Sequence, residues 1–105
     1  FACGFDAAMI DPLSRMMARA ETFRAMTAMV QEAARDLCGG KLVLSHEGGY
    51  SKVYVPFCGH AVMEQLTGST ITAPDPFEER FRDRQPSERF DQFAFGLLHE
   101  MAQVL

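Results

Sequence analysis

Residues 41–50, which read Lys41-Leu-Val-Leu-Ser-His46-Glu47-Gly48-Gly49-Tyr50, decide the fold that this sequence predicts. The apolar run Leu-Val-Leu is too short for a helix and is bounded by glycines, as is typical of a buried strand. Gly48-Gly49 indicate a tight turn at the end of that strand. We therefore expect a strand over residues 41–46, with Tyr50 just beyond its carboxyl end.

The segment before this strand has the periodicity of a helix. From about Ala18 to Cys38, apolar side chains recur at three- and four-residue steps and form one stripe, which consists of Phe23, Met26, Val30, Ala33 and Leu37. Gly39-Gly40 indicate a left-handed C-cap that ends this helix. Residues 1–14 contain Gly4 and Pro12 and are expected to be a strand end that runs into a loop.

Two further helices are predicted after the strand. The first begins near Pro56, because a proline is tolerated in a first turn, and it runs to Leu66 and ends at Gly68. Residues 69–85 are expected to form a loop. The last helix spans about Ser87 to Val104, and its apolar stripe consists of Phe90, Phe93, Leu97, Met101 and Val104.

The resulting order of strand end, helix, strand and helix predicts an α/β fold, in which helices flank a small parallel sheet in a three-layer arrangement. Ligands bind at the carboxyl ends of the strands in such sheets. Asp6 follows the first strand end and Tyr50 follows the second, so both are expected on one rim of the sheet. The apolar stripes of the three helices should pack against the sheet or against each other.

The composition excludes several classes of function. A net charge of −4 offers no electrostatic footprint for nucleic acid or for an anionic membrane. The arginines from Arg80 to Arg89 alternate with acidic residues and predict a solvated surface. The three cysteines are far apart and form neither a disulfide framework nor a zinc clip, so we expect reduced, buried thiols in a cytoplasmic protein.

Three short motifs point to a family. Gly4-Phe5-Asp6, Asp11-Pro12-Leu13 and Glu47-Gly48-Gly49-Tyr50 occur in this order, with one helix-length segment before the third. The combination resembles the C-terminal catalytic part of zinc-dependent deacetylases of the histone deacetylase superfamily, and it is most similar to the bacterial class II histone deacetylase-like amidohydrolases. The resemblance covers nearly the whole chain. It implies a partial arginase/deacetylase-type fold, with residues 1–105 as the C-terminal part of one catalytic domain whose upstream part is absent.

The resemblance also implies roles for five residues. Asp6 would be a zinc ligand, together with an Asp-x-His pair from elsewhere, and Leu13 would line the tunnel that admits an acyl-lysine chain. The Tyr50 hydroxyl would donate a hydrogen bond to the amide carbonyl and then to the oxyanion, which suits a phenol that stays protonated at neutral pH. Gly48 and Gly49 would let the main chain pass close to the substrate. The implied reaction removes acetyl or acyl groups from lysine-like amines by metal-activated water.

The chain departs from the family pattern in two respects. It has no His-His pair, which supplies the family's general base and acid, and no Asp-x-His. His46, His60 and His99 are interpreted as ordinary polar residues. Because the sequence also begins at Phe1, we expect a piece of a longer enzyme, inactive by itself. The alternatives are an acetylpolyamine amidohydrolase, an acetoin-utilisation-type relative, or a truncated non-catalytic remnant that acts as an interaction module; the oligomeric state is left open.

Overall fold

Two short parallel strands and two packed helices form the centre of the computed structural model, which describes residues 1–14 and 16–104. Strand β1 (Ala2–Cys3) pairs in parallel with β2 (Ser45–His46). Helix α1 (Ala20–Cys38) connects the two strands, and α2 (Val55–Thr67) follows them. The predicted β-α-β-α order and the α/β fold class are therefore confirmed.

The strand predicted over residues 41–46 is shorter than expected and is not buried. Only Ser45 and His46 pair with β1, whereas Val43 is 81% exposed. Leu42 and Leu44 are half-buried and line a groove beneath α2. Successive side chains of an extended segment point to opposite sides. Here only one of those sides faces another described element, so Leu42 and Leu44 are half-buried while Val43 is exposed. The prediction of a buried strand is therefore wrong.

Helix α1 ends at Cys38 as predicted, but it begins at Ala20, two residues later than expected, and it buries a different face. Gly39 adopts the left-handed conformation with a φ of 62°, and its N–H donates to the Ala34 carbonyl. The buried side chains are Ala20, Phe23, Thr27 and Ala34. Leu37, from the predicted stripe, is 86% exposed. Thr27, which an apolar stripe leaves out, donates its hydroxyl to the Phe23 carbonyl at 2.7 Å and is satisfied while buried.

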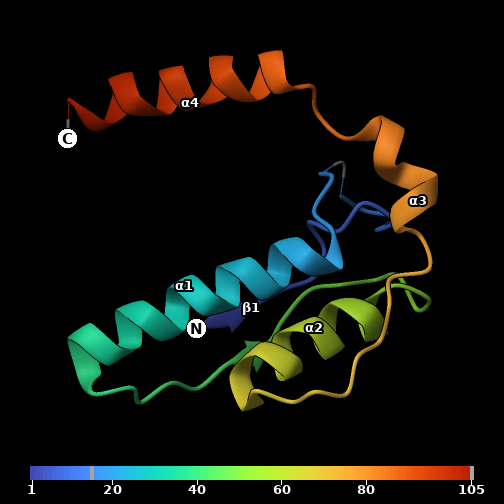
Figure 1. Cartoon of the computed structure of the whole chain (residues 1–105), viewed down its shortest axis with the longest axis vertical. Helices are drawn as coiled ribbons and strands as arrows, with labels where there is room; N and C mark the ends of the chain where they lie inside the picture. Colours follow the sequence, from blue (N-terminus) through green and yellow to red (C-terminus); the bar gives the residue numbers. More distant parts are fainter. Residues whose placement is uncertain (15, 105) are drawn as a thin grey trace.

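Helix α2 begins and ends as predicted and packs side by side with α1 (Figure 1). Pro56 lies in its first turn, and Gly68 ends it in the left-handed conformation with a φ of 66°. At the edge of this pair, Arg24 of α1 forms an ion pair with Glu64 of α2. The core forms where both helices meet β1 and the loop after it, and it consists of Cys3, Phe5, Ala8, Met9, Phe23, Tyr54, Cys58 and Val62.

The C-terminal third of the chain is less closely packed than predicted. The expected loop over residues 69–85 contains a short helix, α3 (Glu78–Phe81), followed by a 3-10 turn (Arg82–Arg84). Helix α4 (Glu88–Ala102) begins where the Ser87 hydroxyl accepts a hydrogen bond from the Phe90 N–H. Figure 1 shows α4 apart from the α1–α2 pair, and its apolar stripe is exposed.

The expectation that all three stripes pack is therefore wrong for α4, because no other described element contacts it. The small parallel sheet remnant and its flanking helices are present as expected, with α1 and α2 packed against each other. Cys3 and Cys58 are buried as predicted, but Cys38 is exposed because it lies at the last residue of α1. None of the described helices is long and apolar enough to cross a membrane.

Tyr54 joins the elements around the core and was not singled out by the sequence. Its side chain is fully buried, and its hydroxyl donates to the Asp75 carboxylate and accepts from the Ala20 N–H at 3.2 Å. Its ring also packs edge-on against Phe77 at 5.6 Å. One phenol thus ties the first turn of α1 to the start of α2 and to the loop before α3. Burial, followed by the hydrogen bond to Asp75, raises the pKa of Tyr54.

We predict that Tyr54→Phe lowers the free energy of unfolding of this chain by about 1–3 kcal/mol, the usual cost of leaving buried hydrogen-bonding groups unpaired. The groups left without the phenol are the Ala20 N–H and the Asp75 carboxylate. Urea denaturation measures the loss. The control is Tyr50→Phe, which removes a hydroxyl from an exposed ring and should change stability by less than about 0.5 kcal/mol. Equal losses in the two variants would contradict the anchoring role of Tyr54.

The raised pKa of Tyr54 also predicts a dependence on alkaline pH. Above the usual tyrosine value of 10.0, the unfolded chain releases the phenolic proton while the folded chain retains it. Because the folded state then binds more protons, its stability decreases as the pH rises through this range, whereas below pH 10 the contribution is complete. In the Tyr54→Phe variant, the free energy of unfolding should decrease less as the pH rises through this range. Unfolding free energies of both proteins at a series of alkaline pH values measure the difference; parallel curves would contradict the prediction.

Candidate active site

The main chain brings the first and third sequence motifs side by side, beyond the ends of the two strands. The Glu47 N–H donates to the Cys3 carbonyl at 3.2 Å, and the Phe5 N–H donates to the Gly48 carbonyl at 2.8 Å. The parallel ladder therefore continues past the short strands to Gly48. As a consequence, Asp6 and Gly48 meet at the same edge of the sheet.

Three glycines allow close contacts between the two motif loops at this edge. A Cβ on Gly4 would lie 2.7 Å from the Asp6 Oδ1, and a Cβ on Gly48 would lie 2.8 Å from the Asp6 Cγ. The Asp6 carboxylate thus occupies the space that two side chains would otherwise fill. Gly49 has a φ of 126°, and its Cβ would lie 2.9 Å from the Phe5 Cβ. The structure therefore gives the glycines a role in seating Asp6 and Phe5; the predicted contact of Gly48 and Gly49 with substrate remains a prediction.

Tyr50 has an accessible side chain on a firmly held main chain. Its ring is 55% exposed. Its N–H donates to the Asp11 Oδ2 at 2.7 Å. The next residue, Ser51, is buried, and its carbonyl accepts from the Tyr54 N–H at 3.1 Å and the Val55 N–H at 3.0 Å, where α2 begins. A phenol with this exposure can donate to a ligand at the edge of the sheet.

Leu13 is also accessible, with 71% of its side chain exposed, and it too depends on Asp11. The Asp11 Oδ1 accepts from the Leu13 N–H at 2.8 Å and from the Ser14 N–H at 3.1 Å. Sequence reasoning used Asp11 only as part of a motif and assigned it no role. The signal that could have found it is the Asp-Pro pair, because an aspartate commonly accepts hydrogen bonds from the N–H groups that follow it in a turn.

Asp11 is a buried carboxylate, with 8% of its surface exposed. Burial by itself would raise its pKa. Hydrogen bonds from the N–H groups of Tyr50, Leu13, Ser14 and Ser51 oppose that effect and hold the pKa of Asp11 below its usual value. Backbone donors stabilise the ionised form of a carboxyl group. Asp11 is therefore negatively charged at neutral pH and accepts hydrogen bonds from two loops at once.

The metal-binding potential of this edge rests on Asp6. A carboxylate is a suitable zinc ligand, but catalytic zinc requires three protein ligands. In residues 1–14 and 16–104, no three His, Cys, Asp or Glu side chains form a group that could hold a metal ion. His46 contacts the Gly48 carbonyl at 3.1 Å, and His60 lies 3.5 Å from Glu64. The described residues by themselves do not complete a zinc site, and the role of Asp6 as a ligand remains a prediction.

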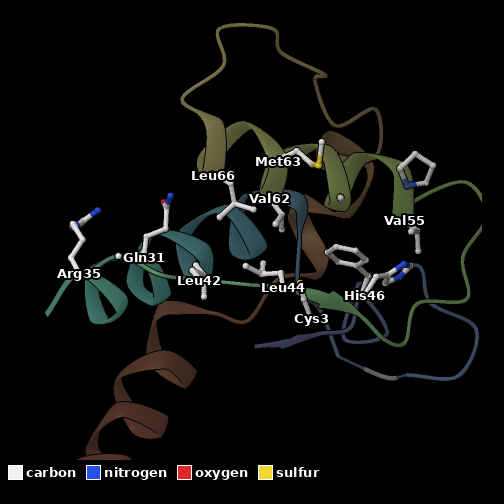
Figure 2. Close-up of a pocket in the computed structure, with 14 residues that line it drawn as sticks. Cys3, Gln31, Arg35, Leu42, Leu44, His46, Val55, Val62, Met63 and Leu66 are labelled. Atoms are coloured by element: carbon white, nitrogen blue, oxygen red, sulfur yellow. The ribbon is translucent and has the colours of Figure 1, made fainter. Parts of the chain in front are cut away.

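A cavity opens beside the strands, and Cys3, Phe5 and His46 contribute to its lining. It has a volume of about 800 Å³ and runs between α2 and the segment that leads into β2, as Figure 2 shows. Val62 and Leu66 line it from α2, and Leu42 and Leu44 line it from the opposite side. Asp6, Leu13 and Tyr50 are not among its lining residues. The cavity is therefore an apolar groove and not the predicted catalytic site.

Comparisons with known proteins agree with these motifs. Residues 1–66 match the family model described as the histone deacetylase domain. Over 101 residues the chain is 50% identical to a histone deacetylase-like amidohydrolase of Pseudomonas aeruginosa, covering 96% of this chain and 27% of that protein. It is 32% identical over 101 residues to histone deacetylase 14, chloroplastic, of Arabidopsis thaliana, covering 96% of this chain and 21% of that protein.

A similar solved structure is the crystal structure of the HDA15 HD domain, with a TM-score of 0.56 and 36% sequence identity. The match covers 71% of this chain and 20% of that one. This likeness supports the arginase/deacetylase-type fold. The chain spans about a quarter of the length of the curated Pseudomonas relative that it matches. With more than half of its residues in the family model, this chain belongs to the histone deacetylase family.

Proposed function

We propose that this chain is the C-terminal part of the catalytic domain of a zinc-dependent deacetylase that hydrolyses acetyl-lysine or similar acylated amines. The observation that supports this most is the shared edge of the sheet. There the Asp6 carboxylate fits between Gly4 and Gly48, and the accessible Tyr50 follows on the same loop. Membership in the histone deacetylase family supports hydrolysis of an amide as the class of reaction.

In the proposed reaction, zinc supplies Lewis-acid activation of water and of the amide carbonyl when it is bound. Asp6 would contribute one carboxylate ligand to it. Tyr50 donates its phenolic hydrogen to the carbonyl oxygen as negative charge develops there, an interaction that is strongest in the transition state. Leu13 gives an apolar wall to the path of the acyl chain. The overall change consumes one water molecule, breaks the amide C–N bond, and releases a carboxylate and an amine.

The geometry suits a donor role for Tyr50 better than a role in proton abstraction. A phenolic hydroxyl is a hydrogen-bond donor and can donate to a developing oxyanion. Its main chain is held on both sides, at Gly48 by Phe5 and at its own N–H by Asp11. A fixed donor that needs no rearrangement as charge forms is the arrangement that stabilises an oxyanion most effectively.

In the complete protein, we predict that Tyr50→Phe keeps zinc bound but lowers kcat on an acetyl-lysine substrate by roughly 10²–10³-fold, the usual loss for one oxyanion donor. Asp6→Ala should instead remove zinc and turnover together, because the site loses a ligand. A fluorogenic acetyl-lysine assay and metal analysis of the purified proteins measure both effects. Asp36→Ala, which changes an exposed carboxylate on α1, is the control and should leave both quantities unchanged. Full turnover by Tyr50→Phe would show that the proposed mechanism is wrong.

We further predict that the 105-residue chain by itself neither hydrolyses acetyl-lysine nor binds zinc tightly. Asp6 is a single carboxylate, and the sequence contains no His-His pair to act as general base and acid. Zinc titration by calorimetry, together with the same fluorogenic assay, tests this expectation. Micromolar or tighter zinc binding with turnover that a chelator abolishes would contradict it.

A further inference from the structure

We propose that Asp11 is a positioning residue for catalysis: its one carboxylate holds the main chain of Tyr50 and the turn that carries Leu13 in a fixed relation to each other. Asp11 does not contact the substrate in this proposal and acts through Tyr50. The inference rests on the function proposed above, in which Tyr50 donates to the oxyanion. Asp11 belongs to one of the three sequence motifs, but the sequence assigned it no role.

The first step is the local turn. Pro12 has no N–H and a restricted φ, so the chain after Asp11 bends in a narrow range of conformations. The Asp11 Oδ1 accepts from the Leu13 and Ser14 N–H groups within this bend. The residues before the bend are fixed as well. The Asp11 N–H donates to the Ala8 carbonyl at 2.9 Å, next to the bridge that pairs Ala8 with Ala18. Asp11 is therefore a rigid point on the body of the fold.

The second step is the contact across the two loops. Asp11 and Tyr50 are 39 positions apart, and their hydrogen bond of 2.7 Å joins the two motif loops directly. Tyr50 follows Gly48-Gly49, and glycines leave the main chain many alternative conformations. A donor that must point at one oxygen atom needs that freedom removed. The hydrogen bond from the Tyr50 N–H to the Asp11 carboxylate restricts the main chain at the residue that carries the phenol.

The third step is the choice of a carboxylate. Asp11 faces N–H groups from Leu13, Ser14, Tyr50 and Ser51, so every neighbour that it binds is a donor. An ionised carboxylate is an acceptor at both oxygens, whereas an asparagine would present an NH2 group to one of these donors. In the described part of the chain, no ion pair includes Asp11. Among the described residues, main-chain N–H groups from the two loops are what stabilises its charge, so the carboxylate depends on the positions of both loops.

Two substitutions separate the turn from the cross-loop contact. Asp11→Ser keeps a hydroxyl that accepts from the following N–H groups, as serine does in such turns, but it is too short to reach Tyr50. Asp11→Asn keeps the size of the side chain and places a donor against one of the N–H groups. Asp36→Asn makes the same chemical change on an exposed position of α1 and is the matched control. All three are made in the complete protein, with and without Tyr50→Phe.

We expect Asp11→Ser to retain zinc and to lower kcat about 10- to 100-fold, the scale of loss for a catalytic group misplaced by about 1 Å. KM for the acetyl-lysine substrate should change less than about threefold, because the lost interaction acts in the transition state. In the Tyr50→Phe background, Asp11→Ser should cost less than about twofold more, since no hydroxyl is left to position. Asp36→Asn should match the parent protein in both backgrounds.

Three results would overturn the positioning role. They are unchanged kcat in both Asp11 variants, an equal loss in both backgrounds, or loss of zinc and fold in both Asp11 variants, which would make the carboxylate a folding element only. Any of these leaves the proposed function intact as long as Tyr50→Phe alone lowers kcat. Full turnover by Tyr50→Phe alone would overturn the proposed function and the positioning role together. Thermal unfolding of each variant and its zinc content identify which result has been obtained.

Discussion

The parallel pairing of residues 2–5 with residues 45–48 is the constraint on which the rest of this structure depends. The register places Cys3 opposite His46, and the hydrogen bond from Phe5 to Gly48 extends it by two residues. A shift of one position would turn the side chains of one strand to the opposite face. Cys3 and Phe5 would then leave the core, and Asp6 would no longer lie against Gly48. The packing of the core and the geometry of the candidate site thus follow from the same few main-chain hydrogen bonds.

Small and polar side chains make the helices fit this pairing. Ala20, Thr27 and Ala34 form most of the buried face of α1, which lets α2 approach closely. Tyr54 then fixes the start of both helices through one hydroxyl. The site loops leave this same framework within a few residues, because Ser51 accepts the first hydrogen bonds of α2 directly after Tyr50. The main chain next to Tyr50 is therefore held by hydrogen bonds to the start of α2, which packs in the core.

The candidate site combines accessible functional groups with buried anchors. Tyr50 and Leu13 expose their side chains, while Asp11 and Ser51 beneath them are buried and satisfied by main-chain contacts. Such a division suits an enzyme, since groups that meet a substrate must be reachable and yet held within a fraction of an ångström. Asp6, Leu13 and Tyr50 do not line the apolar groove of Figure 2, and no described element contacts α4.

The sequence by itself determined the family, the α/β class, the order of the main elements and, to within about two residues, the ends of α1, α2 and α4. These features depend on local signals: motif spacing, glycine C-caps at Gly39 and Gly68, and Pro56 in a first turn. Only the tertiary structure decided which face of α1 is buried, how short β2 is, and that α4 packs against no described element. It also decided that Asp11 bonds to Tyr50. Each of these depends on contacts between residues far apart in the chain, and the periodicity of a single segment does not encode its partner.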